Sequence, residues 1–145
     1  MTKAIIFGFL GLFILLMIIA VNTDSSKEES PSIAINRCVN VSEQVINRIT
    51  GGLKDGDKDI PLSNWQAVKS KDFSDVHFVS TKLNTGGGAI ATFAVNDFIE
   101  GAGMTFSVDS VAKEFFLWPL GSDTSFNISL FDDGVAESQE CTKNL

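Results

Sequence analysis

The sequence predicts an α+β domain, with an antiparallel sheet and helices packed on one face, preceded by a single N-terminal transmembrane helix. Three observations lead to this prediction. Residues 4–21 read AIIFGFLGLFILLMIIAV and contain no charge. After them, one helix-like apolar repeat gives way to short strand-like runs separated by turn residues. Two cysteines, Cys38 and Cys141, stand at the two ends of the foldable region, and a chain of 145 residues favours one domain.

The N-terminal apolar segment predicts a membrane anchor. Eighteen residues rise about 27 Å as a helix, close to the roughly 30 Å hydrocarbon core of a bilayer. We expect residues 1–21 to be an uncleaved anchor, because the run exceeds the roughly 7–15 apolar residues of a signal peptide, which stays the alternative. Lys3 precedes the segment and acidic residues follow it. The positive-inside rule therefore places the rest of the chain outside the cytoplasm.

Residues 22–35 predict a flexible stalk, because they are polar, rich in serine and contain Pro31. Residues 36–145 then form the extracytoplasmic domain. If the anchor is cleaved, this domain is secreted.

The first element of the domain is predicted to be a helix over residues 40–51. Apolar residues recur there at helical spacing, Asn40 or Ser42 can cap the start, and Gly51 with Gly52 marks the end. A charged turn, residues 54–59 (KDGDKD), follows it.

Four strand-like runs come next and predict an antiparallel meander. They cover residues 65–69, 75–83, 89–95 and 104–108, with turns at 85–88 and 96–103.

Three more elements complete the predicted domain. Asp109 is expected to cap a helix over residues 110–117. Residues 125–131 alternate apolar and polar side chains and predict a half-buried strand. Asp132 or Asp133 is expected to cap a last helix that reaches Cys141.

The two cysteines predict a disulfide. In an oxidising compartment such a pair usually bonds, and closing a loop of about 100 residues restrains the unfolded chain by up to ~4.7 kcal/mol in the entropy model. The alternative is a reactive or metal-binding thiol, but neither Cys38 nor Cys141 has a CxxC partner or a nearby histidine.

Two stretches and the last cysteine resemble a family of small exported or membrane-anchored proteins of Gram-positive bacteria. The stretches are residues 67–80 (AVKSKDFSDVHFVS) and 103–119 (GMTFSVDSVAKEFFLWP), and the cysteine is Cys141. The resemblance spans residues 38–141. It implies export and one compact domain framed by a cysteine pair, and it carries over no catalytic residue.

Candidate metal and phosphate sites are weak. Asp55, Asp57 and Asp59 alternate as at the start of an EF-hand calcium loop, but the sixth and twelfth positions hold Ile60 and Gln66 instead of glycine and glutamate. The triplet at residues 86–88 is Gly-Gly-Gly, and it lies between two strand-like runs, which favours a hairpin over a phosphate loop. We expect no metal and no cofactor.

Catalytic candidates are equally weak. His77 is the single histidine, it falls within a predicted strand, and no G-x-S-x-G motif accompanies it. The pair Asp132-Asp133 has the composition for acid–base catalysis, but helix capping explains it better. We therefore expect no catalytic residues and no enzymatic activity.

Binding to other molecules is judged from charge and aromatic residues. The formal net charge is −7, which gives no footprint for nucleic acid. Trp65 and Trp118 are expected to pack in the core, and an exposed one becomes the best partner-binding candidate. The sequence Asn127-Ile128-Ser129 is a glycosylation sequon that matters only in a eukaryotic secretory pathway.

These observations favour a non-enzymatic domain at the cell surface, held at the membrane through residues 4–21, that binds a protein or an envelope component. Two alternatives stay open. One is a small envelope hydrolase that uses His77 with an aspartate or glutamate. The other is an accessory subunit of a membrane complex, in which Gly8 and Gly11 give the anchor a small-residue patch that is not a GxxxG motif.

Overall fold

The computed structural model describes residues 37–85, 87–100 and 102–145. The predicted anchor and stalk, residues 1–35, lie outside them. Within the described ranges no helix has both the length and the apolar character that crossing a bilayer requires.

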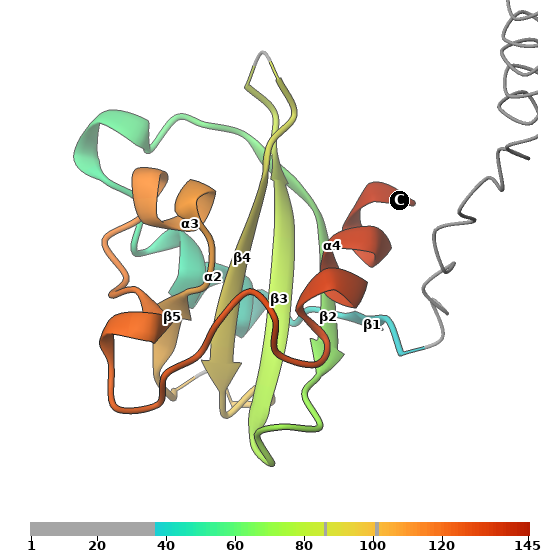
Figure 1. Cartoon of the computed structure of the whole chain (residues 1–145). Coiled ribbons are helices and arrows are strands. Elements are labelled where there is room, and N and C mark those ends of the chain that lie inside the picture. The colour runs from blue at the N-terminus through green and yellow to red at the C-terminus, as the bar shows by residue number, and fades with distance from the viewer. Residues whose placement is uncertain (1–36, 86, 101) are drawn as a thin grey trace, which may run out of the picture. The chain divides into compact units, whose positions relative to one another are not determined.

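The centre of the domain is a five-stranded antiparallel sheet whose spatial order follows the chain, β1-β2-β3-β4-β5. Its strands are β1 Val39–Asn40, β2 Leu62–Lys69, β3 Val76–Leu83, β4 Ile90–Asn96 and β5 Thr105–Ser107. The predicted meander is confirmed, and β1 is an addition that the sequence did not suggest. The long central strands β3 and β4 pair over their whole length, so the core is built around them (Figure 1).

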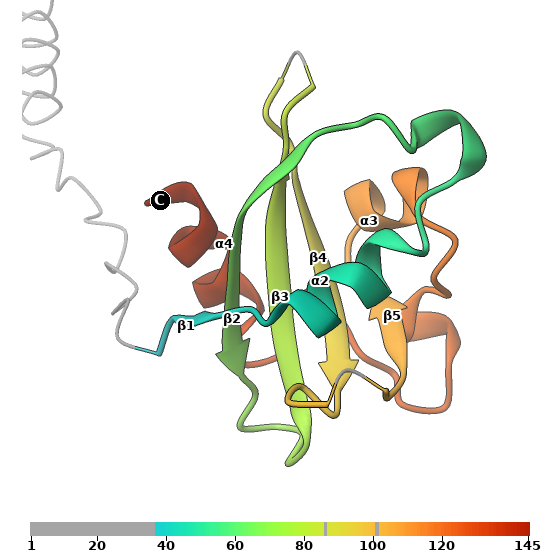
Figure 2. The same ribbon diagram turned by 180° about the vertical axis from the view of Figure 1, so that it is seen from behind.

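Helix α2, Glu43–Thr50, covers one face of the sheet. The backbone N–H of Val45 donates to the Ser42 side chain, which confirms Ser42 as one of the two predicted caps. The side chains of Val45 and Ile49 are fully buried against Val79 and Phe93 of the sheet. Figure 2 shows this helix lying across the strands.

Helix α4, Val135–Lys143, covers the opposite face, so the prediction that helices pack on one face only is wrong. Neighbouring residues of β3 point to opposite faces, and Ser80 points to α4 while Val79 points to α2. The hydroxyl oxygens of Ser80 and Ser138 lie 2.8 Å apart, and the Thr142 hydroxyl donates to the Ser80 carbonyl at 3.1 Å. Small hydroxyl side chains let the helix approach this face closely, although their polarity hides it from a hydropathy pattern.

Helix α3, Ser110–Phe115, is capped by Asp109 as predicted. The strand predicted over residues 125–131 is wrong, because this segment is irregular. Asn127 has a φ of 48°, and the Ile128 N–H donates to the carbonyl of Gly121 at 3.2 Å instead of to a strand. A Cβ at Gly121 would lie 2.8 Å from Cβ of Ile128, so only glycine permits this close packing.

The predicted cap of the last helix is also wrong. Gly134 is the N-cap of α4, with a φ of 97° and no side-chain hydrogen bond. Asp132 instead accepts a hydrogen bond from the Ser129 N–H at 2.7 Å, and Asp133 pairs with Arg37. Both carboxylates are therefore engaged with residues outside the helix.

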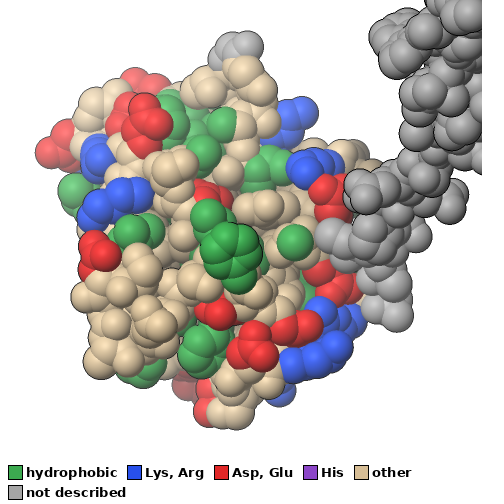
Figure 3. All heavy atoms as spheres, in the orientation of Figure 1, with side chains coloured by type: hydrophobic (Ala, Val, Ile, Leu, Met, Phe, Trp, Pro, Cys, Tyr) green, Lys and Arg blue, Asp and Glu red, His purple; other side chains and the backbone are tan. Residues whose placement is uncertain are grey.

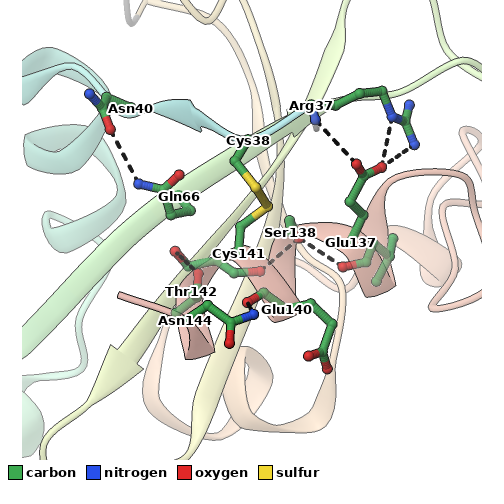
Figure 4. Close-up of a disulfide and its surroundings, with 12 residues drawn as sticks. Arg37, Cys38, Asn40, Gln66, Glu137, Ser138, Glu140, Cys141, Thr142 and Asn144 are labelled. Carbon is green, nitrogen blue, oxygen red and sulfur yellow. Dashed lines mark hydrogen bonds and ion pairs between the residues drawn. A yellow bond between two sulfur atoms is a disulfide. The ribbon is translucent and has the colours of Figure 1, made fainter. Parts of the chain in front are cut away.

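The predicted disulfide is confirmed. Cys38 and Cys141 are bonded, with their Cα atoms 5.9 Å apart, and the bond joins the residue just before β1 to α4 (Figure 4). The two ends of the described domain are thus joined covalently.

Candidate functional site

A first pocket, which we call the His77 pocket, lies at one end of the sheet and has a volume of about 420 Å³. The imidazole of His77 stacks on the ring of Phe98, with ring centroids 4.2 Å apart. Burial lowers the pKa of His77, and the nearby Lys69 lowers it further. The pocket is lined by Lys69, Ser74, Asp75, His77, Asn96, Asp97, Phe98 and Ile99.

The His77 pocket has the groups for acid–base chemistry but not the contacts that would orient them. The Nδ1 atom of His77 has no hydrogen-bond partner in the part of the chain that the structure describes. The Ser74 hydroxyl donates to Asp75 at 3.2 Å rather than to the imidazole. A catalytic histidine is normally held by a carboxylate or carbonyl, so this arrangement gives little support for a hydrolase.

A second pocket, which we call the α3 pocket, also measures about 420 Å³ and lies beside the N-terminal end of α3. The irregular segment after η3, Gly121–Asp123, forms its other wall. Most of the lining surface is apolar. The residues that line it are Val108, Asp109, Ser110, Lys113, Leu120, Ser122, Ile128, Ser129, Leu130 and Phe131.

Large hydrophobic side chains are exposed on the segment that lines the α3 pocket, and two of them, Leu130 and Phe131, line the pocket itself. Phe131 is 97% exposed, and Phe126 and Leu130 are each 47% exposed. In Figure 3 the segment between η3 and α4 faces the viewer, and hydrophobic side chains stand near the middle of this face and elsewhere on it, among acidic side chains, with Lys and Arg side chains toward both sides. An apolar group in this position is typical of an interaction site.

The backbone around these residues is held by local hydrogen bonds. The N–H of Ser129 donates to Asp132, and the N–H of Phe131 donates to the Ser129 hydroxyl at 3.2 Å. Ile128 points inward and is buried, while Leu130 and Phe131 point outward. The turn therefore presents its apolar side chains from a fixed backbone.

Asp109 lines the same pocket and is only 7% exposed. Its Oδ1 accepts a hydrogen bond from the Ala112 N–H at 2.7 Å, which caps α3. Its Oδ2 is closed off from solvent. Burial raises the pKa of this carboxyl, and hydrogen bonding from Ala112, Thr92 and Val111 opposes the shift in part.

The sequence did not point to the α3 pocket. The cap at Asp109 was predicted, but its burial depends on how residues 120–131 fold back over α3. One feature of the sequence could have indicated an exposed apolar side chain here. Phe126, Ile128 and Leu130 would share one face of a strand, and Phe131 would then lie on the other face.

The two tryptophans are half buried. Trp65 packs against the core cluster on the α2 side of the sheet. Trp118 packs there too, over Gly52, and its Nε1–H donates to the Ile49 carbonyl at 3.0 Å. Core packing accounts for both rings, and a role in partner binding stays a prediction.

The remaining candidates are not brought together into a site. Asp55 pairs with Lys58 at 2.7 Å in the short helix η2, Asp55–Asp57. Across residues 37–85, 87–100 and 102–145, no group of three or more histidine, cysteine, aspartate or glutamate side chains could hold a metal ion. The turn between β3 and β4 is closed by the Gly88 N–H donating to Thr85, which agrees with the predicted hairpin.

Comparison with protein-family models, with curated proteins and with solved structures finds no match to this chain.

Proposed function

We propose that this chain is a membrane-anchored extracytoplasmic interaction module without enzymatic activity, and that it binds a protein partner at the α3 pocket. The observation that supports this most directly is the 97% exposure of Phe131 beside a largely apolar pocket. Aromatic side chains that stand next to an apolar pocket are the usual anchors of protein interfaces. The apolar residues 4–21 support the anchor, and the family resemblance supports export.

The α3 pocket suits binding better than chemistry. Asp109 and Lys113 are the charged residues that line it, and Asp109 already caps a helix. The exposed side chains of Leu130 and Phe131 at its edge would gain free energy from being covered by a partner.

A photo-crosslinking experiment tests this function. The photoreactive residue p-benzoylphenylalanine is placed at position 131 of the full-length chain, in cells of its own source. It is placed in a second variant at position 99, because Ile99 is 85% exposed but lines the His77 pocket. We expect a discrete adduct from position 131 that position 99 does not give, and we expect Leu130→Ser to abolish it. Equal adducts from both positions, or none from 131, would contradict the proposal.

A small envelope hydrolase is the second candidate, because one pocket holds His77 together with Asp75 and Asp97. Turnover of a cell-envelope substrate that His77→Gln removes without unfolding the chain would favour it. The third possibility, an accessory subunit of a membrane complex, depends on residues 4–21 and so on a part of the chain outside the described residues.

A further inference from the structure

The most exposed phenyl ring of the domain and an apolar pocket that fits a phenyl ring lie on the same face. Phe131 belongs to the lining of the α3 pocket, but its side chain is 97% exposed, so the ring stands at the rim and does not fill the pocket. Val108 and Ile128 are buried within the lining, and Leu120 and Leu130 continue it toward the surface. A volume of about 420 Å³ is typical of sites for small organic molecules, so the pocket has room for one phenyl ring.

Two charges of opposite sign accompany the pocket and the ring. Lys113 lines the pocket, and its side chain is exposed. Asp132 follows Phe131 directly, is partly exposed, and accepts hydrogen bonds from the N–H and the hydroxyl of Ser129. In the part of the chain that the structure describes, neither Lys113 nor Asp132 forms a salt bridge. The pocket therefore brings a cation, and the ring brings an anion, to any surface that covers them.

We propose that the partner at the α3 pocket is a second copy of this chain, in a two-fold dimer in which Phe131 of each copy enters the α3 pocket of the other. This inference rests on the proposed function and names its partner. A two-fold interface brings the same surface of both copies together, so that surface must hold both halves of every contact. This face does so twice, because the ring complements the pocket and Asp132 complements Lys113. Each of the two contacts then occurs two times in the dimer.

The size and charge of the interface predict a weak dimer that depends on the membrane. The formal net charge of −7 makes two copies repel, but salt screens charges beyond about 8 Å at physiological ionic strength. At short range the face offers both signs, since acidic side chains stand on it with Lys and Arg side chains toward both sides (Figure 3). Two phenyl rings and two ion pairs make a small interface, as in transient complexes. Anchoring both copies in one membrane would raise their effective concentration and so favour the dimer.

Photo-crosslinking of the purified chain tests the inference, because no other protein is then present. Two full-length forms carry p-benzoylphenylalanine at position 131 and different affinity tags, and they are reconstituted together in liposomes of zwitterionic lipid. We expect an adduct that carries both tags, with its crosslinked peptide from residues 108–113 or 120–130, which contain the pocket lining. The same photoreactive residue at position 99 is the control, because Ile99 is 85% exposed but lies outside the α3 pocket. It should give little adduct.

Charge variants test the contact between Lys113 and Asp132. Lys113→Gln removes both ion pairs of the dimer and should lower the adduct yield about fivefold. Asp132→Asn should do the same, although its amide oxygen can still accept from the Ser129 N–H. The two substitutions together should lower the yield no further, because each already removes both pairs. Glu114→Gln removes an exposed charge that does not line the pocket and should not lower the yield. If only net charge mattered, Asp132→Asn would raise the yield instead.

The outcomes separate this inference from the proposed function. Equal two-tag adducts from positions 131 and 99, no two-tag adduct from position 131, or additive effects of the two charge variants would each overturn the dimer as proposed. An adduct with a different protein in cells, without a two-tag adduct in liposomes, would leave the interaction module standing and exclude the second copy as its partner. Absence of any adduct from position 131 in both experiments would contradict both.

Discussion

Nε of Arg37 donates to Oε2 of Glu137 at 2.7 Å, although the two residues are 100 positions apart in the chain (Figure 4). Arg37 also pairs with Asp133 at 2.8 Å and donates to the Lys69 carbonyl at 3.1 Å. The disulfide of Cys38 follows directly. The point at which the described domain begins is therefore fixed to α4 by an ionic and a covalent connection.

Removing the disulfide should lower the stability of the domain strongly. The bond closes a sequence separation of 103 residues, and in the entropy model a loop of this size is worth up to ~4.7 kcal/mol. We expect Cys38→Ser/Cys141→Ser to lower the free energy of unfolding by about 2–5 kcal/mol, measured by chemical denaturation. The reduced wild type should match the double variant. A loss below about 1 kcal/mol would show that the ionic contacts hold this end without the bond.

Arg37→Met should destabilise the domain by about 1–3 kcal/mol, because it leaves the buried Glu137 without its cation. The partial exposure of Arg37 keeps the figure below that of a fully buried pair. Adding Glu137→Gln to Arg37→Met should recover part of the loss, which a double-mutant cycle measures. Additive effects of the two substitutions would mean that the contact contributes nothing to stability.

The same cluster predicts a loss of stability in acid. The hydrogen bond from Arg37 holds the pKa of Asp133 below its ordinary value. The folded state therefore favours the ionised carboxyl, and this contribution is present above about pH 4, the pKa of an unperturbed aspartate. It is lost as the pH falls through the lower, folded pKa. Denaturation of Asp133→Asn between pH 2 and 6 should show a shallower acid dependence than the wild type.

The spacing of apolar residues, together with capping and turn residues, correctly predicted helix α2 and the strands β2 to β5. The helix around Val45 and Ile49 has a cap, a period of 3.6 and a glycine end, and the strands from β2 to β5 are separated by turn residues. The strand predicted at residues 125–131 failed because Ser129 and Asp132 bond to the backbone locally and compete with strand pairing.

The packing of α4 on the second face of the sheet and the α3 pocket could not be predicted from the sequence, for a different reason. The hydroxyl side chains of Ser80 and Thr92 do not mark a buried face by hydropathy, but both are buried, and Ser138 and Gln139 of α4 supply hydrogen-bond partners from more than forty positions away. The pocket likewise depends on the packing of Ile128 against Gly121, which no local pattern encodes.

Asp109→Asn should make the domain at least as stable as the wild type at neutral pH. Burial raises the pKa of Asp109 in the folded state, so the folded state holds its proton more tightly than the unfolded state. Stability from this group is therefore full below the unfolded pKa, about 4, and is lost as the pH rises through the folded pKa. Denaturation across pH 3 to 8 should show this decline in the wild type and not in the variant. Asp109→Ala is the control for the cap and should cost about 1 kcal/mol, whereas an equal loss in Asp109→Asn would contradict the burial argument.

Phe131 and Ile128 should separate binding from folding. Phe131 is almost fully exposed, so Phe131→Ser should change the free energy of unfolding by no more than about 0.5 kcal/mol. Ile128 is buried against Gly121 and Val108, so Ile128→Ala should cost about 2–4 kcal/mol. The proposed interface predicts the reverse order for partner capture. In cells, crosslinking through p-benzoylphenylalanine at Phe126 should be lost in Phe131→Ser and should be weakened less in Ile128→Ala, which keeps the exposed Phe131 ring, at a temperature where that variant stays folded. If Phe131→Ser destabilised the domain as much as Ile128→Ala, the ring would be packing against protein, and its place at an open interface would be refuted.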